Sequence, residues 1–122
     1  MFREMKRKER QLSAELTEKI LNKCTSGVLS VIGDDGYPYG LPIDYWYDEI
    51  ENRIYFHGVK EGHKLDAIKK CNKVSFCTYD KGYRKDGEWP LYINSVIVFG
   101  KISIVNDNEK IIEICKNLCY KF

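Results

Sequence analysis

Polar side chains gather directly after Arg53–His57, a segment with the β-branched and aromatic pattern of a strand. The polar residues are His57, Lys60, His63 and Lys64, and Gly62 stands among them. The helical spacing of the next residues predicts a short helix over 63–70, so Gly-His-Lys stands at a helix start. Backbone N–H groups and the helix dipole attract anions there, glycine permits close approach, and Lys64 and His63 supply charge and hydrogen bonds. The segment therefore suits a phosphate-bearing ligand; the more common use of such a pattern is a solvated helix start.

His57 ends an otherwise apolar strand, where a histidine is ordinarily a hydrogen-bonded residue at the rim of a sheet. Two histidines without a carboxylate pattern beside them predict no metal site. Five cysteines, an odd number without a CxxC pair, predict small buried reduced thiols rather than disulfides or zinc ligands. A Cys–His nucleophile pair remains open, although no local motif supports it.

A second group of unusual residues interrupts the strand-like segment 37–47. Pro38 and Pro42 cannot donate ladder hydrogen bonds, and Gly36 and Gly40 lie beside them. Two interpretations follow. The segment curves a barrel, or the freed backbone groups of residues 41–45 bind a flat polar ligand, of which a flavin ring is one.

The elements that position these groups follow from periodicity. Ser13 is predicted to cap a helix that ends near Ser26-Gly27. Strands are predicted over 28–32, 37–47, 53–57 and 73–79, with a hairpin turn at Gly33–Gly36. The polar stretch 80–90 is predicted to be an exposed loop.

The C-terminal part predicts a long strand and a helix. Residues 91–105 are predicted to form a strand that bends at Gly100. Asn106-Asp107 then caps a helix with Ile111, Ile112, Cys115, Leu118 and Cys119 on one face. The fold class is therefore mainly β with short helices, arranged as a small antiparallel barrel.

Length and charge limit the partners. A chain of 122 residues, 43% of them hydrophobic, predicts one domain over residues 1–122. A net charge of +2 argues against nucleic acid, although residues 1–10 carry a local excess of +3. No apolar run reaches the about 18 residues of a membrane helix, and no signal peptide precedes the domain, so no membrane partner and a cytoplasmic location are expected.

Taken in order, short segments along almost the whole chain resemble the pyridoxamine-phosphate-oxidase-like split barrels that bind flavin mononucleotide (FMN), and among them the nitroimidazole-resistance group. The segments are Arg3-Glu4-Met5, Arg7-Lys8, Thr25–Leu29, Asp35–Tyr39, Leu41-Pro42, Ile54–His57, Gly62–Ile68, Lys73–Cys77 and Ser95–Gly100. Each is weak alone, and together they are specific for the family.

The resemblance implies a split β-barrel homodimer with two FMN sites between the subunits. Backbone groups of Leu41, Pro42, Ile43, Asp44 and Tyr45 would lie along the flavin ring, and Tyr55, Phe56 and His57 would line the same pocket. Gly62, His63 and Lys64 would hold the phosphate, and Ser95, Val96 and Ile97 would approach from the other subunit. Family members usually continue past the last helix, so the resemblance predicts either a short member or a missing C-terminus.

Three functions are weighed, the first of them implied by the resemblance. The first is an FMN-dependent oxidoreductase that passes electrons to a small molecule such as a nitroaromatic, with His57 placed to protonate a product. The second is a non-catalytic flavin- or haem-binding protein, with His57 or His63 as an iron ligand. The third, a nucleic-acid-binding barrel, is disfavoured by the low charge. Pyridoxamine-phosphate oxidation itself is also disfavoured, because the basic residues for that substrate's phosphate are not found.

Overall fold

The structure is a computed structural model that describes residues 2–3, 5, 7–58 and 62–121. Its elements, in chain order, are η1 (Lys8–Arg10), α1 (Ala14–Lys23), β1 (Ser26–Ile32), η2 (Asp34–Gly36), β2 (Pro38–Asp48), β3 (Arg53–Phe56), α2 (His63–Lys70), β4 (Lys73–Tyr79), β5 (Ser95–Lys101) and α3 (Asn108–Lys121).

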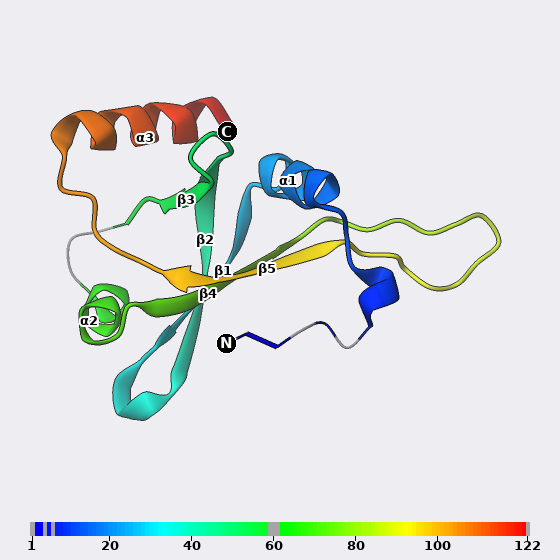
Figure 1. Ribbon diagram of the computed structural model, residues 1–122, viewed down its shortest axis with the longest axis horizontal. Helices are drawn as coiled ribbons and strands as arrows, with labels where there is room; N and C mark the ends of the chain where they lie inside the picture. The colour runs from blue at the N-terminus through cyan, green and yellow to red at the C-terminus, as the bar shows by residue number, and fades with distance from the viewer. Residues whose placement is uncertain (1, 4, 6, 59–61, 122) are drawn as a thin grey trace.

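Five antiparallel strands form one curled sheet in the order β3-β2-β1-β4-β5 (Figure 1). The predicted class, mainly β with short helices, is confirmed, and so are the bounds of α2 and β4. Within the described residues the sheet is a half-barrel, because β3 and β5 stand at its two ends without pairing.

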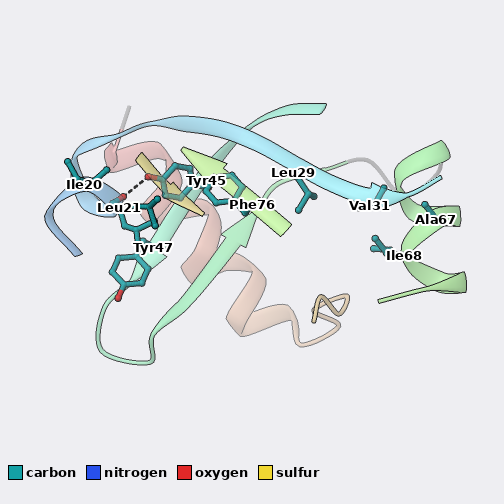
Figure 2. Close-up of a cluster of buried hydrophobic side chains, with 10 residues drawn as sticks. Ile20, Leu21, Leu29, Val31, Tyr45, Tyr47, Ala67, Ile68 and Phe76 are labelled. Atoms are coloured by element: carbon teal, nitrogen blue, oxygen red, sulfur yellow. Dashed lines mark hydrogen bonds between the residues drawn. The ribbon is translucent and has the colours of Figure 1, made fainter. Parts of the chain in front are cut away.

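The inner face of the sheet carries the main core. Alternate side chains of β1, β2 and β4 point inward, and α1 and α2 pack against them. Figure 2 shows the α1 residues beside Tyr45 and Tyr47, and the α2 residues beside Val31 at the other end. The core members are Ile20, Leu21, Leu29, Val31, Tyr45, Tyr47, Ala67, Ile68, Phe76 and Val96. Each large apolar side chain buried here contributes about 1.5–3 kcal/mol.

Tyr45 joins α1 to the sheet. Its side chain is fully buried, meets Phe76 edge-on, and donates a 2.7 Å hydrogen bond to the carbonyl oxygen of Leu21 (Figure 2). That carbonyl lies in the last turn of α1 and has no partner within the helix. Burial raises the pKa of the Tyr45 hydroxyl to about 12, because the charged form would lose its hydration.

The outer face is covered by α3 at only one end. Ile114 and Leu118 pack on Tyr55, whose ring stacks on Trp46 at 5.3 Å. Asp107 caps α3 by accepting hydrogen bonds from the N–H groups of Glu109 and Lys110, which confirms the predicted cap.

The predicted apolar face of α3 is wrong in part. Ile111, Ile112 and Cys119 are exposed, whereas Ile114, absent from the prediction, is buried. Neighbouring isoleucines fit two adjoining stripes of a helix, and contact with Tyr55 selects the one that contains Ile114. The five cysteines are free thiols, but the prediction that they are buried is also wrong, since four are half-buried and Cys119 is exposed.

Gly27 is a strand residue, not the predicted end of a helix. The helix α1 ends at Lys23, and Gly27 lies in β1 against Phe76 of β4. A Cβ at Gly27 would stand 2.4 Å from the carbonyl oxygen of Cys77 and 2.5 Å from the Phe76 ring. Glycine is therefore needed here for close packing.

The predicted long strand over 91–105 is shorter, because its first residues belong to a separate arm and β5 covers Ser95–Lys101 alone. Asp80 closes the base of this arm: its carboxylate accepts hydrogen bonds from the N–H groups of Gly82 and Asn94 and from the Asn94 amide. Burial by itself would raise the pKa of Asp80, but these hydrogen bonds lower it below its usual range. These hydrogen bonds hold the arm, which we define as residues 81–93. It consists of residues 81–90 of the predicted exposed loop and the three residues that follow them.

Candidate functional site

The edge of β2 facing away from β1 is open over residues 38–44. Among the described residues, β3 pairs only with Tyr45–Asp48 of that strand. The carbonyl oxygen of Tyr37 accepts from the N–H of Gly33, and the N–H of Tyr45 donates to the carbonyl oxygen of Thr25. The odd-numbered residues of β2 therefore point their peptide groups toward β1. The even-numbered residues therefore present their peptide groups to the open edge.

This register explains the two prolines of β2. Pro38 and Pro42 are even-numbered, so the N–H groups they lack would have pointed to the open edge and not into the ladder. Gly40 and Asp44 keep N–H donors at the same edge, and all four residues keep carbonyl acceptors there. The segment offers a row of backbone donors and acceptors to a flat polar partner.

The start of α2 has a different kind of free donor. Gly62 precedes it with φ 135° and contributes no side-chain cap, whereas the Ser13 hydroxyl oxygen caps α1. The first N–H groups of a helix have no partners within the helix, so those of α2 remain available to an anion.

Lys64 lies beside the chain that leaves β3. Its ammonium is so close to Gly58 that a Cβ built there would stand 2.6 Å from Nζ. His57, the residue before, is exposed and directly follows Phe56, which pairs with Tyr45 at the end of the β2–β3 ladder. The fold thus brings the open edge of β2, His57 and Lys64 into one neighbourhood.

His63 is already engaged with the β1–β2 hairpin. Its ring lies 4.2 Å from the ring of Tyr39, and its Nε2 accepts a 3.3 Å hydrogen bond from the N–H of Asp34. The Asp34 carboxylate stands 3.8 Å from the same nitrogen. These contacts position the start of α2 and leave the other ring nitrogen for a ligand, so direct phosphate contact by His63 stays a prediction.

The remaining predicted residues are dispersed. Leu41 and Ile43 are half-buried beside the core and Tyr45 is fully buried within it, and the peptide groups of these three residues point toward β1 and not to the open edge. Tyr55 lies under α3 on the outer face, while Phe56 meets Phe76 on the inner face. The side chains of Tyr55 and Phe56 therefore lie on opposite faces of the sheet, as the alternation of a strand implies, and their place beside a flavin with His57 stays a prediction.

Ser95, Val96 and Ile97 lie on β5, three strands from β2. Neighbouring strands are about 4.8 Å apart, so these residues are about 14 Å from the open edge within one chain. Sequence reasoning noted Gly40 beside the prolines of β2 but did not count it among the ligand-binding residues. It missed Gly58, to which no sequence signal pointed.

Two surface cavities lie away from this edge. One of 360 Å³ is lined by residues of α1 together with Glu49, and one of 280 Å³ lies between Trp46 and the end of α3. Neither includes a residue predicted to bind the ligand.

Three solved structures share this architecture. A candidate 5-nitroimidazole antibiotic resistance protein from Bacteroides thetaiotaomicron aligns with a TM-score of 0.81 at 18% identity, over 92% of this chain and 68% of that one. An FAD-binding protein from Mesorhizobium loti aligns with a TM-score of 0.69 at 22% identity, over 89% and 72%. The flavocytochrome Anf3 from Azotobacter vinelandii aligns with a TM-score of 0.77 at 18% identity, over 96% of this chain and 56% of that one. These likenesses establish the split-barrel fold.

The family follows from the sequence itself. Residues 13–121 match the family described as pyridoxamine 5'-phosphate oxidase, and the chain belongs to that family. No curated protein matches the chain significantly. No helix in the described ranges has the length and apolar character needed to span a membrane.

Proposed function

We propose that this protein binds FMN and passes electrons from the reduced flavin to a small molecule such as a 5-nitroimidazole. One observation carries the proposal: the free backbone edge of β2 and the uncapped start of α2 with Lys64 lie in one neighbourhood. The first suits a flat heterocycle with a polar edge, and the second suits a phosphate. Membership of the pyridoxamine 5'-phosphate oxidase family and the flavin-binding structural neighbours support the same ligand.

Each part of FMN has chain atoms that match its chemistry. Peptide groups of Gly40, Pro42 and Asp44 would hydrogen-bond the polar edge of the flavin ring. The first N–H groups of α2 and the ammonium of Lys64 would hold the phosphate, which Gly62 lets approach closely. When bound, the flavin supplies the electron-transfer chemistry that side chains lack.

His57 is the described side chain best placed to move a proton. It is exposed and directly follows Phe56, the residue of β3 that pairs with Tyr45 where the open edge of β2 begins. In this proposal its ring donates a proton to the product of a reduced nitro group, while the neighbouring backbone orients the flavin.

A second copy of the chain completes the site. Ser95, Val96 and Ile97 are too far from the open edge to meet a flavin bound to the same chain. In a homodimer they would approach the partner's flavin, giving two sites between subunits.

Spectroscopy and turnover test this function together. Protein reconstituted with FMN and desalted should keep a flavin absorption spectrum, which anaerobic NADH or NADPH should bleach and a 5-nitroimidazole should restore. A retained flavin that no nitroaromatic reoxidises would reduce the proposal to flavin binding alone. A Soret band in the purified protein, without flavin uptake, would overturn it in favour of haem.

A further inference from the structure

The chain exposes more surface than a compact monomer of its size. Its accessible surface is 9886 Å² for a mass of 14.3 kDa, whereas the scaling of folded monomers gives about 6,800 Å². The excess of about 3,000 Å² exceeds the roughly 800 Å² that each partner contributes to a standard interface. A stable dimer therefore has ample surface to bury.

Part of the excess lies on the outer face of β1, β4 and β5. Strand pairing aligns Pro42, Val28, Cys77 and Ile97 in one row across four strands. The next row contains Gly40, Ser30, Ser75 and Phe99. Ile97 is 60% exposed and Phe99 57%, although the ring of Phe2 stacks on Phe99 at 5.0 Å. We call these two rows the outer patch; apolar side chains flank small ones there, so another protein surface can approach closely.

The rest of the excess includes the arm, residues 81–93, which extends away from the sheet in Figure 1. The arm has internal structure. Tyr83 and Tyr92 exchange two backbone hydrogen bonds and stack their rings at 5.4 Å, and Lys85 lies 4.8 Å from the Tyr92 ring. Together with the hydrogen bonds that Asp80 accepts at its base, these contacts hold the arm in a defined shape. The arm would therefore lose little conformational entropy on docking.

The arm presents apolar side chains that its own chain leaves uncovered. Trp89 is 88% exposed, and Leu91 and Ile93 are also exposed. Leu91 and Ile93 lead along the chain into Ile97 and Phe99, so the arm continues the outer patch. Large contiguous apolar surface of this kind marks a protein–protein interface, and tryptophan is a frequent anchor in such interfaces.

We propose that the arm of one copy docks on the outer patch of a second copy, with Trp89 as its anchor. A twofold dimer uses the same surface on both subunits, so a chain that carries both an apolar arm and an apolar patch is complementary to itself. The net charge of +2 opposes this association only weakly. The inference rests on the homodimer in the proposed function and names the surface that forms it.

Sedimentation velocity over a concentration series tests the inference on the full chain without flavin. Trp89→Ala and Phe99→Lys should each raise the dimer dissociation constant at least about tenfold. The matched control is Ile50→Lys, which places the same charge at a residue 94% exposed in the turn between β2 and β3 and should leave dimerisation unchanged. Circular dichroism confirms that each variant is folded.

Thiol labelling gives a second measurement that needs no variant. Cys77 lies in the middle of the outer patch, so its maleimide labelling, followed by peptide mass spectrometry, should slow as the wild-type protein is concentrated. A wild-type chain that stays monomeric would overturn both the homodimer and this inference. A dimer that neither variant weakens, with Cys77 labelled equally at all concentrations, would overturn this inference alone. Retention of FMN is a separate readout and tests the proposed cofactor.

Discussion

Replacement of Lys64 by alanine should weaken FMN binding and spare riboflavin binding, because the two flavins differ only in the phosphate. The Lys64 ammonium is held beside Gly58 at the start of α2, half-buried and already positioned for an anion. A hydrogen bond to a charged group contributes about 1.5–3 kcal/mol. The N–H groups of α2 would still hold the phosphate, so the lower end applies. We expect the FMN dissociation constant to rise about tenfold to thirtyfold.

Isothermal titration with FMN and with riboflavin measures this difference directly. Lys69→Ala is the matched control, because Lys69 is an exposed lysine in the last turn of the same helix and its removal should leave both affinities unchanged. Gly58→Ala keeps the charge but places a Cβ 2.6 Å from Lys64 Nζ, so it should displace the ammonium and lower FMN affinity in the same direction. Unchanged FMN affinity in Lys64→Ala, or an equal loss for riboflavin, would refute the phosphate role.

Three further predictions concern stability and the start of α2. Gly27→Ala should lower the free energy of unfolding by about 1–3 kcal/mol or more, measured by urea denaturation, because its Cβ would meet the backbone of Cys77 at 2.4 Å. Wild-type stability should fall by up to about 2–3 kcal/mol between pH 10 and 12, because the pKa of Tyr45 is about 12 when folded and about 10 when unfolded; Tyr45→Phe should flatten this slope. Gly62→Ala should lower the free energy of unfolding by about 1–3 kcal/mol and weaken FMN binding, because φ at this position is 135°. The cause is backbone strain and not a clash, since no atom lies within 4 Å of the added Cβ. An unaltered Tm would contradict this prediction.

Much of the fold could be predicted from the sequence, because its signals are local. The alternation in Lys73–Tyr79 and the helical spacing of Leu65 and Ile68 were enough to place β4 and α2 with their bounds. Asp107 was identifiable as a helix cap because the preference depends only on its own side chain and the next few N–H groups.

The errors arose where contacts between residues far apart in the sequence determine the local structure. Ser26-Gly27 has the composition of a helix end, but the ring of Phe76 and the carbonyl group of Cys77, both far along the chain, leave no room for a Cβ at Gly27. The strand over 91–105 was predicted too long because Tyr92 pairs with Tyr83 in the arm and not with the sheet. No periodicity within either segment reveals these partners.

The candidate site was predicted as a set of residues and not as an arrangement. The phosphate-binding role proposed for Gly62 and Lys64 rests on local chemistry, and the prolines of β2 indicated an unusual edge. That β3 pairs with only the last part of β2, leaving residues 38–44 open beside His57, follows from the register of the folded sheet. Ser95, Val96 and Ile97 remain a prediction that depends on a second subunit.

The most direct test of the central claim is an equilibrium titration of the purified apoprotein with FMN, followed by flavin absorbance and fluorescence. The structure predicts saturation at one FMN per chain, with FMN bound more tightly than riboflavin because the start of α2 and Lys64 add a phosphate contact. A titration without saturation, or equal affinities for the two flavins, would contradict the site described for this chain.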